Sequence, residues 1–123
     1  MSFVSRLRGR LPRRPRSAGP AEATALIEEG ALLLDVRDRT EWNAGHARVA
    51  RHVPLAQLPS HMDSLPEGQL VITVCRSGLR SSRAARLLAD HGHEVVNLTG
   101  GMIAWARAGL PVVDRDSRPG RVV

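Results

Sequence analysis

Short apolar runs alternate with amphipathic segments along most of this chain. Residues 31–34 form a continuous apolar run, and residues 70–74 form a second one that is rich in β-branched side chains. Runs of this length and composition predict strands that are buried on both faces of a sheet. Shorter strands are expected at residues 51–54, which end in a proline, and at residues 94–98.

The segments between these strands have helical patterns. Residues 20–29 have a proline at the start and are followed by a glycine, as helices often are. Asp38 and Glu41 have the spacing of a capping box for a short helix, and Pro59 is expected to interrupt another one. Two further helices have apolar faces at helical spacing: Ala84, Leu87, Leu88 and His91 in the first, and Met102, Trp105 and Ala106 in the second.

Strands that alternate with helices indicate a parallel sheet with helices on both of its faces. We therefore predict an α/β fold, a small three-layer sandwich with a mostly parallel sheet of four to five strands. The length of 123 residues suits one domain, which we place at residues 20–113. Residues 1–19 are expected to be a basic mobile tail and residues 114–123 a loose C-terminal tail, because both are polar and contain proline.

The positive charge of the chain is concentrated at its N-terminus. The net charge is +6, and residues 1–19 hold six arginines and no acid. The remainder is close to neutral, so the charge does not predict specific binding of nucleic acid. The tail is interpreted as a solvated segment, as a contact for an acidic surface, or as a targeting leader. No apolar run reaches membrane-spanning length, and we expect a cytoplasmic protein.

A single cysteine, Cys75, limits the redox and metal chemistry of the chain. It excludes a disulfide framework, a cysteine-based zinc site and a resolving cysteine within the chain. The five histidines are scattered, and His91 and His93 bracket a helix-ending glycine, where surface positions are expected. We therefore expect neither a bound metal nor a cofactor.

The segment that contains Cys75 joins a buried strand to a helix, which is where open parallel sheets bind ligands. The first turn of the helix offers unpaired N–H groups and the positive end of the helix dipole, and Arg76 and Arg80 add positive charge. Such surroundings lower the pKa of a cysteine, so we predict a thiolate nucleophile that attacks an anionic substrate. The alternative is that Cys75 is a small buried apolar side chain at the end of a strand.

Four motifs follow one another in the chain. They are Leu34-Asp35-Val36-Arg37, Glu41-Trp42-x-x-Gly45-His46, Cys75-Arg76-Ser77-Gly78-Leu79-Arg80-Ser81 and Asn97-Leu98-x-Gly100-Gly101-x-x-x-Trp105-x-x-x-Gly109-Leu110-Pro111. In order and spacing they resemble the rhodanese-like domain, over about residues 20–113. The resemblance implies a mostly parallel five-stranded sheet and a sulfurtransferase whose catalytic cysteine is Cys75. The residues that it implies for binding the substrate are Arg76, Ser77, Gly78, Leu79 and Arg80, with Ser81 in a supporting position.

The mechanism that the resemblance implies is a double displacement through a cysteine persulfide. Cys75 takes the outer sulfur of thiosulfate or a similar small anionic donor, and an external thiol or protein cysteine then accepts that sulfur. Asp35 and Arg37 are expected to support the loop by ion pairing, or else to pair with each other. The six residues from Cys75 to Arg80 match the sulfurtransferases of this family, since the related phosphatases have one residue more.

Some positions are expected to be structural or depart from the family pattern. Trp42, His46 and Trp105 are interpreted as packing and turn residues. The family has a strand just before the first helix, and because residues 16–19 are poor strand formers, this edge strand is expected to be short or absent. Residues 47–51 depart from the turn that the family commonly has there, which affects the expected local loop but not the site.

Two other functions remain open on this fold. One is a non-catalytic or regulatory module whose loop only binds an anion or a partner, although an intact Cys75 with two neighbouring arginines argues against a dead site. The other is a phosphatase or an arsenate reductase. The loop length argues against the phosphatase, and an arsenate reductase with one cysteine would need an external thiol.

Overall fold

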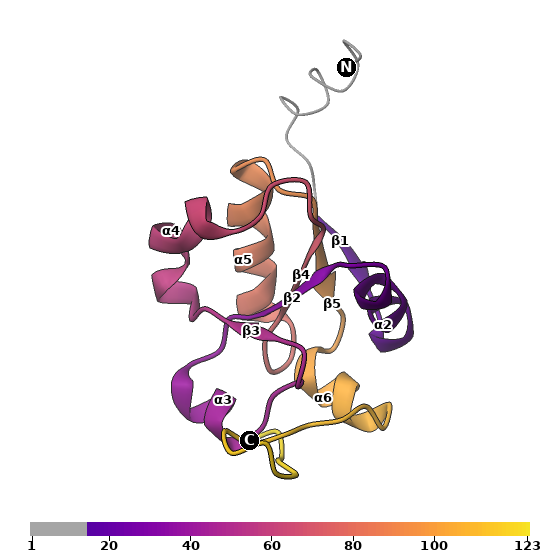
Figure 1. Ribbon diagram of the computed structural model, residues 1–123. Helices are drawn as coiled ribbons and strands as arrows, with labels where there is room; N and C mark the ends of the chain where they lie inside the picture. Colours follow the sequence, from indigo (N-terminus) through magenta and orange to yellow (C-terminus); the bar gives the residue numbers. More distant parts are fainter. Residues whose placement is uncertain (1–14) are drawn as a thin grey trace.

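The computed structural model describes residues 15–123. A five-stranded sheet with the order β1-β5-β4-β2-β3 runs through its centre, and every neighbouring pair of strands is parallel (Figure 1). The strands are β1 (Arg16–Ala18), β2 (Leu32–Asp35), β3 (Arg51–His52), β4 (Val71–Val74) and β5 (Val95–Leu98). The predicted α/β class and parallel sheet are confirmed.

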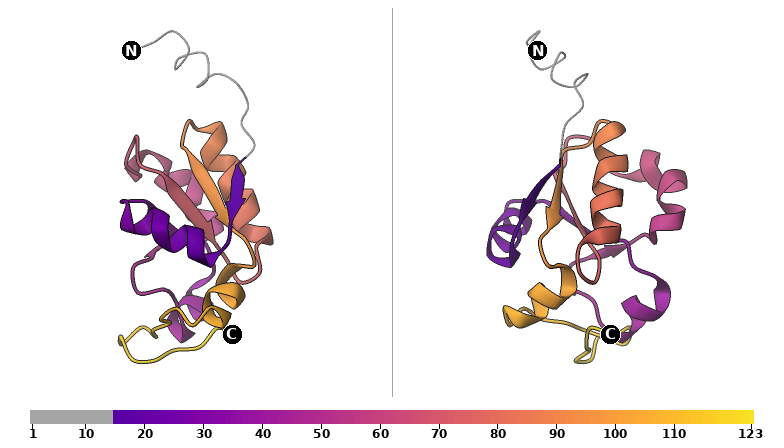
Figure 2. Two further views of the ribbon diagram at one scale, coloured as in Figure 1. Left: turned by 90° about the vertical axis from the view of Figure 1, so that its right-hand side faces the viewer. Right: turned by 180° about the vertical axis from the view of Figure 1, so that it is seen from behind.

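Helices cover both faces of this sheet, and Figure 2 shows the three layers from the side. The helices are α2 (Pro20–Glu28), α3 (Arg39–Ala44), α4 (Leu58–His61), α5 (Leu79–Asp90) and α6 (Gly101–Arg107), with short 3₁₀ helices η1 (Leu55–Gln57) and η2 (Met62–Ser64) on either side of α4. One apolar core joins the sheet to α4 and α5, and a second joins it to α2 and α6. Pro59 lies in the first turn of α4 and so begins this helix rather than interrupting it.

The side chains of the central strand β4 alternate between the two cores. Val71 and Cys75 belong to the core under α5, whereas Ile72 and Val74 belong to the core under α2 and α6. Because side chains alternate along a strand, Thr73 lies on the same face as Cys75. The strand therefore delivers Cys75 to the α5 side of the sheet at its carboxyl edge.

The edge strand β1 forms, although its sequence is a poor strand signal. Its three residues pair in parallel with residues 96–98 of β5, and Ala18 is buried. The predicted boundary of the tail at residue 19 is therefore wrong, because residues 16–18 are part of the sheet. The rest of the predicted basic tail, residues 1–14, lies outside the described residues.

The C-terminal segment is not the loose tail that its composition predicts. Arg121 N donates to Ala44 O at 3.0 Å, and Gly120 N donates to Val112 O at 2.9 Å. Gly45 lies so close to this segment that a Cβ there would overlap the Arg121 carbonyl. Backbone hydrogen bonds to the end of α3 hold the segment in place, a long-range contact that polarity and proline content do not reveal.

Two of the predicted helix faces are partly wrong. In α5 the buried positions are Ser81, Ala84, Ala85 and Leu88, whereas Leu87 and His91 are exposed. In α6 Met102 and Trp105 are buried, but Ala106 is exposed. Each helix covers a narrower part of the sheet than the apolar pattern suggests. No helix of residues 15–123 is long and apolar enough to cross a membrane.

Candidate active site

The loop that contains Cys75 lies at the carboxyl edge of the sheet, between β4 and the start of α5 (Figure 1). Gly78 precedes the first residue of α5 and has φ +124°, a conformation that is strained for any residue with a side chain. The turn allows Gly78 N to donate a hydrogen bond back to Cys75 Sγ at 3.1 Å. The backbone conformation of the loop therefore requires glycine at this position, and it directs the Gly78 N–H group towards the sulfur of Cys75.

The sulfur of Cys75 is surrounded by hydrogen-bond donors. The residue is 1% exposed, and the Ser81 hydroxyl lies 3.3 Å from Sγ. Burial raises the pKa of the Cys75 thiol, but the hydroxyl of Ser81 and the backbone N–H groups of Ser81, Gly78 and Ser77 outweigh burial, so the net pKa is lowered. The lowered pKa agrees with the predicted thiolate, although its main causes are Ser81 and the backbone rather than the two arginines.

The first turn of α6 holds the other side of this loop. Met102 N donates to Cys75 O at 2.8 Å, and Ile103 N donates to Arg76 O at 3.1 Å. A Cβ on Gly101 would lie 2.5 Å from the carbonyl oxygens of both Cys75 and Arg76. Gly101 therefore lets the first turn of α6 approach the loop that contains Cys75, a contact that the sequence alone did not indicate.

Arg80 is held by Glu41, a residue that the sequence placed in a capping box and in one of the four motifs, but not at the Cys75 loop. The capping box between Asp38 and Glu41 forms as predicted. The same Glu41 carboxylate accepts two hydrogen bonds from Arg80, at 2.6 and 2.8 Å. This contact lowers the pKa of Glu41 and raises that of Arg80. The ion pair that supports the loop thus comes from α3, after β2, rather than from the end of β2 itself.

Asp35 and Arg37 pair with each other instead of bracing the loop. Both side chains are fully buried, and Arg37 Nη2 lies 2.8 Å from Asp35 Oδ2. The same nitrogen donates to Gly45 O at 2.7 Å. Arg37 Nη1 is buried without a hydrogen-bond partner among the described residues. Of the two expected arrangements, the pairing of Asp35 with Arg37 is confirmed and the ion pair with the loop is not formed. The pair fixes the end of β2 against the turn after α3.

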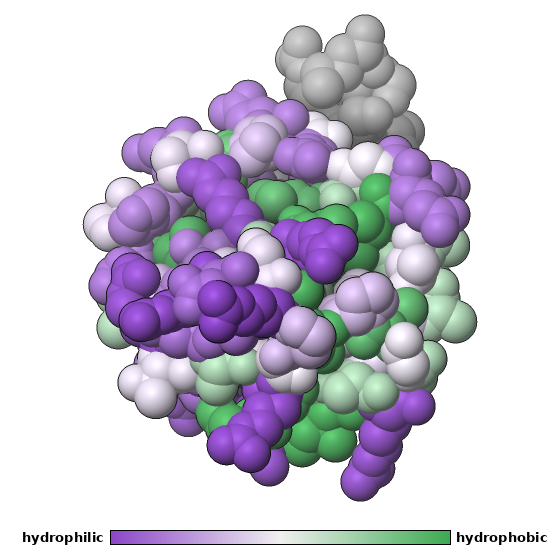
Figure 3. All heavy atoms as spheres, turned by 60° about the horizontal axis from the view of Figure 1, so that its bottom comes forward, coloured by the Kyte–Doolittle hydropathy of each residue, from purple (hydrophilic) through white to green (hydrophobic). Residues whose placement is uncertain are grey.

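The remaining predicted loop residues face solvent. Arg76 and Ser77 are exposed, and Leu79 is 73% exposed at the start of α5. Arg76 Nε donates to the backbone oxygen of Val123 at 3.1 Å. In Figure 3, where the lower edge of the molecule in Figure 1 is turned forward, polar and apolar surface are interspersed. The loop thus combines an exposed Arg76 with a buried Cys75 sulfur.

The aromatic residues near the site have the packing role that was predicted for them. Trp42 is stacked with His46 and with His52, at ring-centroid distances of 3.5 and 4.7 Å. Trp105 is buried and donates to Pro111 O at 3.0 Å. These contacts join α3 to β3 and α6 to the segment that follows it.

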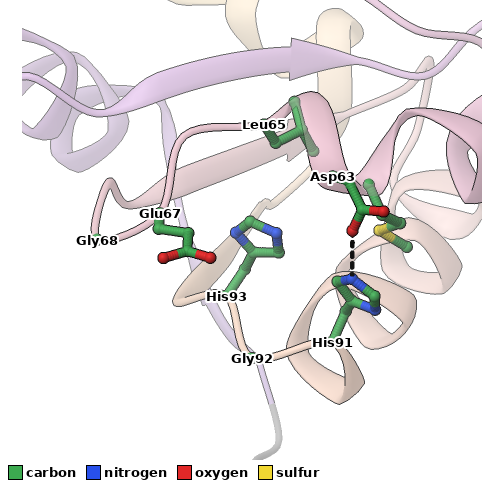
Figure 4. A pocket seen from close by; sticks show the side chains of 8 residues that line it. Asp63, Leu65, Glu67, Gly68, His91, Gly92 and His93 are labelled. Carbon is green, nitrogen blue, oxygen red and sulfur yellow. Dashed lines mark hydrogen bonds and ion pairs between the residues drawn. The ribbon is translucent and has the colours of Figure 1, made fainter.

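A hollow of about 690 Å³ lies away from Cys75, at the opposite end of α5 (Figure 4). It is bordered by His91 and His93 on the turn after the helix and by Asp63 and Glu67 across from them. His91 Nε2 lies 3.3 Å from Asp63 Oδ1. Within the described residues no group of three such side chains is placed to hold a metal ion. This hollow contains no part of the Cys75 loop.

Comparison with known proteins connects this geometry to a family. A family model described as a rhodanese-like domain matches residues 19–108. The chain belongs to the rhodanese-like family. A protein named sulfurtransferase from Allochromatium vinosum is 42% identical over 86 residues, which are 69% of this chain and 80% of that protein. Thiosulfate sulfurtransferase GlpE from Actinobacillus pleuropneumoniae is 34% identical over 95 residues, 76% of this chain and 88% of that protein.

The fold agrees with solved members of the family. The crystal structure of a rhodanese-related protein from Thermoplasma volcanium aligns with a TM-score of 0.74 and 28% identity, covering 80% of this chain and 97% of that one. The described residues therefore contain a rhodanese-like domain, and its relatives include proteins named as sulfurtransferases.

Proposed function

We propose that this protein is a sulfurtransferase that moves sulfane sulfur from thiosulfate, or a similar small anionic donor, to a thiol through a persulfide on Cys75. The observation that carries the proposal is the surroundings of the sulfur, where Gly78 N and the Ser81 hydroxyl lie 3.1 and 3.3 Å from Sγ. Donors at these distances stabilise a thiolate, which is the reactive form of the group.

In the first half of the reaction the Cys75 thiolate attacks the outer sulfur of thiosulfate. A new S–S bond forms, the S–S bond of thiosulfate breaks, and its electron pair leaves with sulfite. The terminal sulfur of the persulfide is anionic, and N–H groups at the start of α5 stabilise such charge as they do an oxyanion. The buried position of Cys75 shields the intermediate from water.

The two arginines have different roles in this proposal. Arg80 is neutralised by the two hydrogen bonds to Glu41 and so shapes the loop. Arg76 is exposed and forms no ion pair with an acidic side chain of residues 15–123; its Nε donates to the oxygen of Val123. Arg76 is therefore the cation that attracts the donor and stabilises the departing sulfite.

In the second half an acceptor attacks the terminal sulfur and the Cys75 thiolate leaves. The chain has no second cysteine, so the acceptor is an outside thiol or a cysteine of another protein, and cyanide replaces it in an assay. Because Cys75 is the single cysteine, the second half of the reaction needs an acceptor from outside this chain.

The test is intact mass spectrometry of the protein after incubation with thiosulfate, followed by cyanide. Wild type should gain the mass of one sulfur atom and lose it to cyanide as thiocyanate, whereas Cys75→Ser should gain nothing. An Arg76→Ala variant serves as a second comparison, and it should be loaded more slowly while keeping a reactive thiol. Absence of added sulfur on a wild-type protein whose Cys75 still reacts with iodoacetamide would refute thiosulfate as donor. Turnover of phosphate esters or arsenate in its place would refute the sulfurtransferase.

A further inference from the structure

The Ser81 hydroxyl beside the catalytic sulfur has one proton and two acceptors within reach. Its oxygen lies 3.3 Å from Cys75 Sγ and 3.1 Å from Gly78 O. A hydroxyl donates one hydrogen bond, so the proton stabilises the thiolate only when it is not used by the carbonyl. Whether Gly78 O is already occupied by other donors therefore decides whether the Ser81 hydroxyl donates to Cys75 Sγ.

Two other groups donate to the same carbonyl oxygen. Ser82 N lies 3.0 Å from Gly78 O in the first turn of α5, and Asn97 Nδ2 lies 3.2 Å from it. A carbonyl oxygen has two lone pairs, and these two N–H groups occupy both. The Ser81 proton is then left for the sulfur of Cys75.

The sheet fixes Asn97 in this position. Thr73 and Asn97 are opposite each other in β4 and β5, and the Thr73 hydroxyl donates to Asn97 Oδ1 at 3.2 Å. This bond directs the amide oxygen towards Thr73 and the amide nitrogen towards Gly78. Thr73 is fully buried, so the orientation is set inside the core and not by solvent.

We propose that Asn97 is a positioning residue of the active site, which occupies the Gly78 carbonyl and so directs the Ser81 hydroxyl proton onto Cys75. The inference rests on the proposed function only in taking Cys75 as the reacting group. Asn97 acts through Gly78 and Ser81 and does not contact the sulfur. Its role is to keep the sulfur in the thiolate form.

Replacement of Asn97 or Thr73 would leave the charged groups around Cys75 unchanged. They are Arg76 on the loop of Cys75, Arg80 in the first turn of α5, Glu41 on α3, and the buried Asp35–Arg37 pair at the end of β2. An asparagine and a threonine are neutral at every pH in question, so replacing them alters no charge. A changed pH profile would therefore report the hydrogen bonds.

The experiment is the rate of Cys75 alkylation by iodoacetamide as a function of pH, which needs no sulfur donor. In Asn97→Ala the midpoint should move to higher pH, and the rate below the midpoint should fall about three- to tenfold, as expected for the loss of one hydrogen bond to a thiolate. Asn43→Ala on α3 is the matched control, because Asn43 bonds Arg115 N through its backbone oxygen, and its profile should match wild type.

The decisive measurement is the double variant of Asn97→Ala with Ser81→Ala. Because Asn97 acts through the Ser81 proton, its removal should add no further shift once Ser81 is replaced. Equal shifts of Asn97→Ala in both backgrounds, or no shift in the wild-type background, would overturn the proposal. Should Asn97→Ala fail to fold, Thr73→Val, nearly equal in volume, must shift the midpoint in the same direction with Ser81 present and not without it. Since no donor is used, failure here is distinct from failure to form a persulfide.

Discussion

Replacement of Gly101 by alanine tests whether α6 holds the loop that contains Cys75 in place. Gly101 has φ +59°, and a Cβ there would lie 2.5 Å from Cys75 O and from Arg76 O. Ordinary contacts between such carbon and oxygen atoms begin at about 3.3 Å, so the loop and the helix must separate by roughly 0.8 Å.

The expected cost of Gly101→Ala has two parts. The left-handed backbone costs about 1 kcal/mol with a side chain present, and the separation weakens the hydrogen bonds of Met102 N and Ile103 N to the loop, which are worth about 1 kcal/mol each. The free energy of unfolding should therefore fall by about 3 kcal/mol. A displacement approaching 1 Å at a reacting group also costs about 100-fold in rate, so sulfur transfer should fall by that order.

Gly109→Ala is the matched control for this experiment. Gly109 has φ +78°, but a Cβ there would have nothing within 4 Å. It should lose about 1 kcal/mol of stability and keep the wild-type rate. Urea unfolding and sulfur transfer to cyanide measure the two quantities for each variant. If Gly101→Ala resembled Gly109→Ala in both, the reasoning that α6 positions the loop would be refuted.

Three further predictions concern charges in and near the site. Asp35→Ala leaves Arg37 buried without its counter-ion and should lower the free energy of unfolding by about 3–5 kcal/mol in urea titrations; a loss below 1 kcal/mol would contradict the pairing. Glu41→Gln should destabilise the protein at neutral pH, because the pKa of Glu41 is lowered by Arg80. The stabilisation by the Glu41–Arg80 ion pair is present above the unfolded pKa of Glu41 and is lost as the pH falls through its folded pKa. The free energies of unfolding of wild type and variant should therefore converge in acid. A difference that stays constant with pH would argue against a stabilising ion pair. The alkylation rate of Cys75 should rise with pH through a midpoint and then level off, and this midpoint should lie below that of a free cysteine in an unstructured peptide measured in the same buffer, since the pKa of Cys75 is lowered. A midpoint at or above that of the peptide would contradict the hydrogen bonds to the sulfur.

The strands, the helix caps and the reactive loop were predictable because they depend on neighbouring residues. The capping box from Asp38 to Glu41 formed as its spacing requires, and the run before Cys75 became the central strand β4. The helix faces were less accurate, as exposed Leu87 and Ala106 show. Apolar spacing identifies a face, but the neighbouring elements decide how much of it is covered.

The sequence by itself determined the fold class, the family motifs and the place of the single cysteine between a strand and a helix. Only the tertiary structure decided the partners: Glu41 for Arg80, α6 for the backbone of the loop, and Asn97 for Gly78. It also decided that residues 16–18 join the sheet and that residues 120–121 bond to neighbouring backbone. The physical reason is that a hydrogen bond or ion pair between segments depends on where the sheet brings their ends together, and residue type and spacing along one segment carry no record of that distance.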